Sequence, residues 1–438
     1  MSHELHIERT AKLVEELTPD AGRDFLHLVG CRECIALAER LLAADLPRSS
    51  REVDYGPLLT ELEARSPGLL SQMAARKAEM ERRFTELMDR APAGRLEGVA
   101  TEERYQAPGL VDLCLYESWA AQPGDPGQAE HLAVLGLTAA EAMTARGLEV
   151  EDLLARAHAL RANARRLQGD EEEAEKGFRE AARHLPGSAV PGDRALVCQF
   201  LAQLRRDQGR LDEAAGLLWR AGTLYGEVGE VQEEGACFTR LGLLLVEDGS
   251  PEEAESPLRR ACDVLDARTD PGRAARARLA LAYCYARQGR KAGAVRMARS
   301  ARPLYEHAAD ARALRGFAWF EGRIAVLTGG LEEAVGFLAS ARGGFLAAGE
   351  IRLAAQATVD LALALTEAGS PRSISKLLQG FPSEPRGGVE KEAMRILGDF
   401  LAAGSVPRGL EEIRDASAEA QERLRRILPY DEWTDSND

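Results

Sequence analysis

The sequence is poor in aromatic residues, which make up 5% of its 438 residues, and it has no excess of basic ones. Its 56 Lys and Arg are outnumbered by 71 Asp and Glu, giving a formal net charge of −15. This balance argues against a surface that coats nucleic acid. No apolar run approaches the roughly 20 residues that span a bilayer. The first residues also lack the basic-then-apolar order of a signal peptide. We therefore expect neither a nucleic-acid nor a membrane partner.

Disulfide and enzyme signatures are missing as well. Seven cysteines form an odd count without a disulfide framework, which favours a reducing, cytoplasmic location. There is no phosphate-binding loop, no G-x-S-x-G and no H-E-x-x-H. The histidines of the central region are scattered along the chain, and nothing in the sequence brings two of them together. We therefore predict that the protein is not an enzyme.

A glycine recurs every 40 residues along the centre of the chain: Gly169, Gly209, Gly249, Gly289, Gly329 and Gly369. Each follows one helical pattern and precedes another, whose first turn is often acidic, as in Leu211-Asp212-Glu213-Ala214. Acids there suit the helix dipole. We expect each glycine to end the first helix of a unit in a left-handed conformation. Repetition at this period predicts stacked helix pairs.

Small residues recur in the same register. Seven positions before each glycine lie Ala162, Ala202, Gly242, Ala282, Gly322 and Ala362. After each of the first five glycines, alanines also lie five and twelve residues later, whereas Ile374 stands at the first of these positions after Gly369. Phe178, Leu218, Leu258 and Leu338 are large apolar residues between the two alanines. Because helices approach closely only where a side chain is nearly absent, these positions predict the helix crossings.

This constellation resembles the tetratricopeptide repeat, although the unit is 40 residues long and the usual one has about 34. The resemblance implies an all-α fold, a right-handed α-solenoid of about six helix pairs. Terminal units of such stacks are atypical because one face meets water. The predicted organisation is a small helical unit, a linker with connecting helices, a degenerate capping repeat, six repeats, and closing helices with an acidic tail, at residues 1–46, 47–106, 107–150, 151–382 and 383–438. Within the linker, we expect 91–106 to be an irregular connection.

The N-terminal unit contains His27, Cys31 and Cys34 in the order H-x3-C-x2-C. Two thiolates separated by two residues, with a histidine one helical turn upstream, suit a tetrahedral zinc ion that needs a fourth ligand. His3 and His6 are the nearby candidates. The arrangement resembles the zinc-binding anti-sigma domain, and the spacing in that family favours His3. The resemblance implies a structural zinc ion. A redox-active Cys-x-x-Cys pair is the alternative.

A stack of helix pairs offers a concave groove lined by its first helices. Projecting the 40-residue register predicts a lining that is polar and basic in the early units and apolar and aromatic in the later ones: Arg166, Gln203, Arg206, Leu243, Tyr283, Trp319 and Arg323. Aromatic and arginine side chains dominate binding energy at interfaces. The alternative is that some of these side chains pack against the next unit.

These features predict a cytoplasmic regulator that binds a protein or peptide in its groove without catalysing a reaction. A sigma factor is one partner that the resemblance implies. Two alternatives stay open. In one, the zinc unit senses redox state, because oxidised thiolates release metal. In the other, the chain is a regulatory subunit that holds a separately encoded protease or nuclease.

Overall fold

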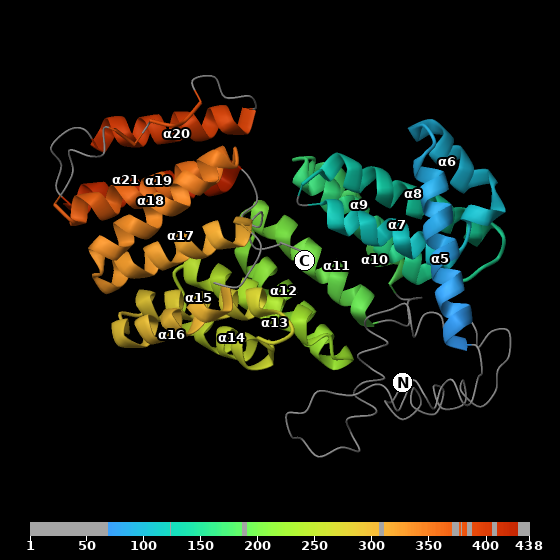
Figure 1. Cartoon of the computed structure of the whole chain (residues 1–438), viewed down its shortest axis with the longest axis horizontal. Coiled ribbons are helices and arrows are strands. Elements are labelled where there is room, and N and C mark those ends of the chain that lie inside the picture. The colour runs from blue at the N-terminus through green and yellow to red at the C-terminus, as the bar shows by residue number, and fades with distance from the viewer. Residues whose placement is uncertain are drawn as a thin grey trace, which may run out of the picture. The chain divides into compact units, whose positions relative to one another are not determined.

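The computed structural model describes residues 69–122, 124–185, 191–305, 311–369, 376–377, 379–382, 388–404 and 410–427. Every regular element in these ranges is a helix (Figure 1). The chain divides into two compact units. Residues up to Phe200, with Thr223–Glu230, form the first, and Leu201–Gly222 with the residues from Val231 onward form the second. The predicted all-α architecture of consecutive helix pairs is confirmed.

The first unit begins with helices that precede the six glycine-bounded repeats. Its elements are α5 (Leu69–Met88), α6 (Pro92–Thr101), the 3-10 turn η1 (Glu103–Tyr105), α7 (Pro108–Ala121), α8 (Pro126–Ala145), α9 (Glu151–Leu167) and α10 (Glu171–His184). Helix α8 packs between α7 and α9, and α9 packs against α10. Asp125 caps α8 by accepting a hydrogen bond from the backbone N–H of Gln128. Asp170 caps the start of α10 in the same way, by accepting a hydrogen bond from the backbone N–H of Glu173.

Two helices cross the boundary between the units, α11 (Pro191–Asp207) and α12 (Leu211–Val228). The second unit then continues as a regular stack: α13 (Val231–Glu247), α14 (Pro251–Val264), α15 (Pro271–Arg287), α16 (Lys291–Tyr305), α17 (Ala311–Thr328), α18 (Leu331–Ala347) and α19 (Ile351–Glu367). Here each first helix packs against its own second helix and against the next first helix. We call α9, α11, α13, α15, α17 and α19 the first helices and α10, α12, α14, α16 and α18 the second helices.

The two kinds of helix differ in burial. Second helices bury one stripe, as α14 does with Ala254, Leu258 and Ala261, and leave their outer face in water. The first helices α15 and α17 are covered on most sides, since each packs against its partner helix and against the first helices before and after it. Every residue of α19 from Ile351 to Val359 is buried. In the second unit, the core therefore runs along the first helices.

The glycine prediction is confirmed. All six recurring glycines have a positive φ, between 72° and 92°. In this left-handed conformation the helix ends, and the following backbone N–H bonds back to a carbonyl of the last turn, as Arg290 does to Tyr285. An L-residue with a Cβ is strained there.

The small residues mark close helix contacts, as expected. A Cβ on Gly242 would lie 2.2 Å from Cγ of Leu258, and one on Gly322 would lie 2.5 Å from Cγ of Leu338. Both leucines are fully buried on the second helix of the same pair. Glycine at these positions therefore lets a first helix rest directly on a leucine.

The stretches on either side of the six repeats also bear on the sequence predictions. The irregular connection predicted at 91–106 is wrong, because residues 92–101 form helix α6, with Pro92 at its start and Gly98 and Val99 buried. Packing against α8 stabilises this short helix. At the other end, α20 (Gly388–Gly404) and α21 (Leu410–Ile427) pack against α19 and against each other. Most of the positions of the sixth second helix, 370–375 and 378, lie outside the described residues.

Candidate functional site

Three of the predicted groove residues, Tyr283, Trp319 and Arg323, lie on the neighbouring first helices α15 and α17, and Arg323 lies against the other two. Arg323 on α17 donates a hydrogen bond of 2.7 Å from Nη2 to the Tyr283 hydroxyl on α15. Its guanidinium also lies over the Tyr283 ring, 4.6 Å from the centroid. On the other side, Nε of Arg323 is 3.8 Å from Asp360 on α19. One arginine thus links three consecutive first helices.

Trp319 and Leu243 differ from the expected open lining. Trp319 is 1% exposed, donates a 2.7 Å hydrogen bond from Nε1 to Oδ2 of Asp360, and meets Phe345 edge to face. Leu243 and Tyr283 are each 3% exposed. Their side chains pack between helices because the next first helix covers them. Of the later residues that were predicted to line the groove, Arg323 has the largest exposed fraction, with 16% of its side chain in water.

The early predicted residues are divided between the units. In the first unit, Asn163 donates to the side-chain oxygen of Gln122, and Arg166 donates from Nε to Oδ1 of Asn163 at 2.8 Å. Both are buried in α9. Gln203 and Arg206 belong to the second unit, where Gln203 is buried and Arg206 lies 3.5 Å from Asp207. The structure therefore places these residues in polar contacts within the chain.

Sequence reasoning missed the acidic partners of Arg156. This side chain on α9 contacts Asp112 of α7 at 2.7 Å, Asp193 of α11 at 3.5 Å and Asp152 of its own helix at 3.7 Å. Burial lowers the arginine pKa, but the carboxylates outweigh it and raise the pKa overall. Asp112 lies 44 residues before Arg156, close to the repeat length, and that spacing is the signal that could have identified the pair.

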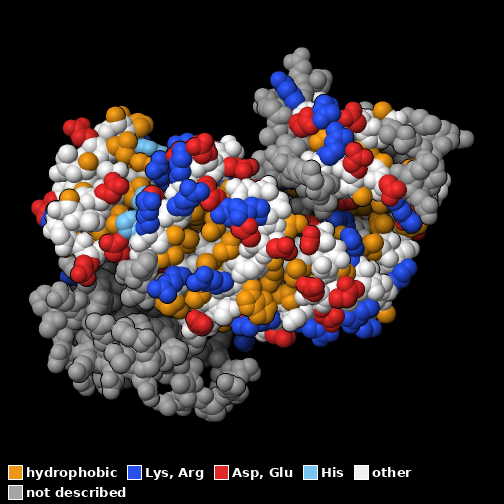
Figure 2. Space-filling model, turned by 180° about the vertical axis from the view of Figure 1, so that it is seen from behind, with side chains coloured by type: hydrophobic (Ala, Val, Ile, Leu, Met, Phe, Trp, Pro, Cys, Tyr) orange, Lys and Arg blue, Asp and Glu red, His pale blue; other side chains and the backbone are white. Residues whose placement is uncertain are grey.

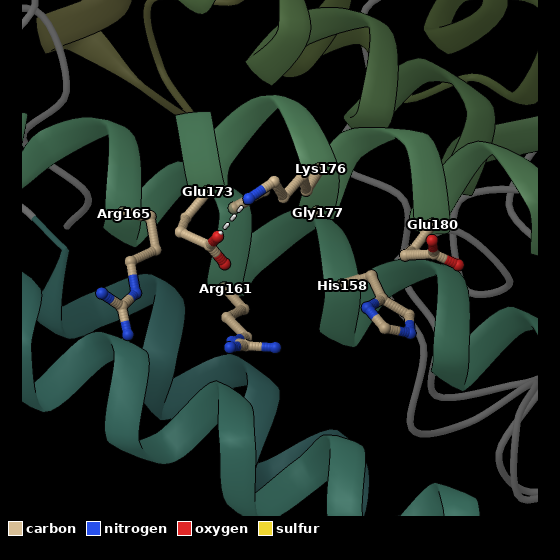
Figure 3. A pocket seen from close by; sticks show the side chains of 8 residues that line it. His158, Arg161, Arg165, Glu173, Lys176, Gly177 and Glu180 are labelled. Atoms are coloured by element: carbon tan, nitrogen blue, oxygen red, sulfur yellow. Dashed lines mark hydrogen bonds and ion pairs between the residues drawn. The ribbon is translucent and has the colours of Figure 1, made fainter. Parts of the chain in front are cut away.

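A small cavity lies between α9 and α10. It measures about 90 Å³, far below the 300–1,000 Å³ of typical ligand pockets. Figure 3 shows Arg165, Arg161 and Lys176 along one part of its rim, and His158 and Glu180 along the other. Lys176 is paired with Glu173 at 2.8 Å, and Arg165 is paired with Glu130. The cavity has room for a few water molecules.

The histidines of this pair contradict the expectation that no two come together. His158 stacks on His184 with centroids 5.6 Å apart and planes at 7°, and Nδ1 of His184 contacts Glu151. His158 lies in the middle of α9 and His184 at the end of α10, and the packing of the two helices brings them side by side. Burial, with His184 beside it, lowers the pKa of His158 to about 4. It is therefore neutral at pH 7.

The described cysteines are buried or half-buried thiols. Burial raises the pKa of Cys114 and of Cys262 to about 12 and that of Cys284 to about 11. Since the thiolate is the reactive form, these side chains are poor nucleophiles and poor metal ligands at neutral pH. Cys114 and Cys284 are buried in the core, and Cys262 packs against it.

The predicted zinc ligands His3, His27, Cys31 and Cys34, and the alternative His6, lie outside the described residues. Within the described ranges, no three histidine, cysteine or acidic side chains are grouped so as to hold a metal ion. Among the helices of the same ranges, none has both the length and the hydropathy needed to cross a membrane.

No protein-family model matches the chain, and no curated protein matches it. Solved structures resemble it distantly. BtubC (BKLC) from P. vanneervenii is 18% identical, with a TM-score of 0.41, over 52% of this chain and 91% of that one. A Rap protein complexed with competence and sporulation factor is 15% identical, with a TM-score of 0.49, over 72% and 88%. PilF of Pseudomonas aeruginosa is 19% identical, with a TM-score of 0.35, over 52% and 89%. At these values the similarities carry no inference about partners.

Proposed function

We propose that this protein is a non-catalytic interaction scaffold that holds a peptide or helix of a partner protein against the edges of its first helices. The observation that carries the proposal is a series of side-chain bridges between consecutive first helices, spaced by about one repeat. Arg273 contacts Glu233 at 2.6 Å, and Arg323 contacts Tyr283 at 2.7 Å. A similar bridge joins Arg156 of the first helix α9 to Asp112 of α7, which precedes the repeats.

These bridges suit recognition because they fix the binding groups in advance. Arg323 is held by the Tyr283 hydroxyl and ring and lies near Asp360, so it loses little side-chain freedom when a partner arrives. Its side chain still reaches water, as does that of Arg156, which is 23% exposed. Fixed arginines beside aromatic rings are the residue types that carry most binding energy at protein interfaces.

The remaining surface favours a protein partner over a polyanion. Figure 2 shows basic and acidic side chains intermingled over the face seen there, and the chain as a whole is acidic. Nucleic-acid binding needs a basic patch or stripe. The raised thiol pKa values and the small cavity between α9 and α10 offer no group for nucleophilic chemistry on a substrate.

A display library of peptides, panned against the full chain, tests this proposal. Binding of the selected peptides is then measured by fluorescence anisotropy to the wild type, to Arg323→Ala and to Arg299→Ala. Arg299 is the matched control, because it is exposed on the second helix α16. We expect Arg323→Ala to weaken binding at least tenfold and Arg299→Ala to leave it within about twofold. Equal affinities for the two variants, with circular dichroism spectra like that of the wild type, would contradict the proposal.

A second part of the proposal concerns the N-terminal residues. The H-x3-C-x2-C pattern of His27, Cys31 and Cys34 supports a zinc-stabilised unit of anti-sigma type, with His3 as the fourth ligand. A redox sensor differs from a structural zinc site in one observable property. Its zinc content falls on treatment with peroxide, whereas a structural site keeps its metal. Co-purification with a protease or nuclease whose activity the chain suppresses would favour the regulatory-subunit alternative.

A further inference from the structure

Helix α21 lies on one face of α19. Its buried residues, Ile413, Ser417, Ala420 and Leu424, follow each other at intervals of four, three and four, which places them on a single stripe. Much of the rest of α21 is charged, and Arg414, Asp415 and Glu419 are exposed. The helix is therefore amphipathic, and it packs against both α19 and α20.

Polar contacts fix the direction of α21 along α19. Arg414 donates to Oε1 of Glu367 from Nε at 2.9 Å and from Nη2 at 2.8 Å. About two turns further along, Gln421 donates from Nε2 to the Gln356 carbonyl and to Oδ1 of Asp360, each at 2.9 Å. The two helices thus run antiparallel. The face of α19 that bears Gln356, Asp360 and Glu367 is called the α19 face below.

The α19 face belongs to the same bridged series as the proposed binding residues. Asp360 accepts a hydrogen bond from Gln421 on Oδ1 and one from the Trp319 indole on Oδ2. It also lies 3.8 Å from Nε of Arg323. A single carboxylate therefore joins α17, α19 and α21. Gln356 also lies 200 residues, or five repeats, after Arg156, so it holds the register position of that arginine.

We propose that α21 is an internal ligand, which occupies the α19 face in place of an amphipathic helix of a partner protein. The inference rests on the proposed function. The partner helix would carry small or aliphatic anchors at i, i+4, i+7 and i+11, a side-chain donor directed at Asp360, and a basic residue directed at Glu367. This is the helix-in-groove mode of recognition, read from the helix that fills the site.

The packing of α21 allows it to leave. Its stripe holds two large apolar residues, Ile413 and Leu424, beside the small Ser417 and Ala420. Helix α19, in contrast, is buried without a break from Ile351 to Val359. Elements with few buried apolar contacts open at lower free energy than the core they rest on. Displacement of α21 therefore leaves the first-helix stack intact.

A synthetic peptide of residues 410–427, labelled with fluorescein, is the probe. Its binding to the full chain is measured by anisotropy for the wild type, for the double variant Arg414→Ala with Gln421→Ala, and for the control Arg395→Ala. The ion pairs of Arg395 are within its own helix, to Glu392 and Asp399. In the wild type the tethered helix competes at an effective concentration in the millimolar range. We expect the double variant to bind the peptide at least tenfold more tightly than the wild type and the control to match the wild type.

Equal binding to the wild type and the double variant, or none to either, would overturn the inference. Hydrogen exchange on the wild type provides a second test that needs no variant. Amides of α21 exchanging faster than those of α19 support displacement, and joint exchange of both helices shows a fixed cap and overturns it. If the chain forms a concentration-dependent dimer and the peptide dissociates it, the helix that α21 mimics belongs to a second copy of the chain and not to another protein. If library peptides bind through Arg323 while the 410–427 peptide does not bind, this inference fails and the proposed function stands.

Discussion

Replacing Gly242 with alanine tests the packing logic of the repeat. The added Cβ would lie 2.2 Å from Cγ of Leu258 and 2.5 Å from one of its methyl carbons. Leu258 is fully buried, and Cγ is its branching carbon, so the whole side chain must shift. Overpacking of this kind costs about 1–3 kcal/mol, and a contact this short places the cost near 3. The gain in helix propensity is about 1 kcal/mol, so we expect a net loss of about 2 kcal/mol.

The matched control is the same substitution at Gly336, inside α18, where an added Cβ meets nothing within 4 Å. There, alanine should stabilise the chain by about 0.5–1 kcal/mol. Urea denaturation followed by circular dichroism gives both free energies. In a Leu258→Ala background the clash disappears, so Gly242→Ala should become stabilising. The next unit carries alanines, Ala282 and Ala298, at these two register positions. A Gly242→Ala chain as stable as the wild type would refute the reasoning.

Two further predictions follow from the structure, and a third follows from the sequence of the N-terminal residues. Gly289→Ala should cost about 1–2 kcal/mol in urea denaturation, because φ there is 74°. The pKa of His158 is lowered to about 4 from 6.5, so the unfolded chain takes up this proton first. Its contribution to stability is complete above pH 6.5 and is lost as pH falls toward 4, and His158→Gln should flatten the pH dependence of unfolding in that window. Elemental analysis should find one zinc ion per chain, absent from Cys31→Ser, and equal metal contents would contradict the zinc proposal.

The repeat register could be predicted from sequence because it depends on local chemistry. The need for a positive φ selects glycine at one position of each repeat. The buried stripe of α10 appears in the sequence as small and apolar residues at helical spacing, Ala174, Phe178 and Ala181. Both signals involve residues within one helix or one turn. They are readable without knowing where the neighbouring helices lie.

The candidate site was harder to predict, because the positions of its side chains depend on contacts between successive repeats. The 40-residue register predicted Trp319 in the groove lining, but it did not show that Asp360 and Phe345 contact the buried indole. Periodicity likewise identified α21 as a closing helix without showing that Gln421 reaches Asp360, 61 residues earlier in the chain. Such pairs depend on how deeply one helix covers the next.

The most direct test of the central claim is photo-crosslinking of a library-selected peptide to the full chain, with the attachment sites mapped by mass spectrometry. The account predicts attachment to the first helices α15, α17 and α19, near Tyr283, Arg323 and Asp360, and reduced attachment in Arg323→Ala. Attachment confined to the exposed outer faces of α14, α16 and α18 would contradict it.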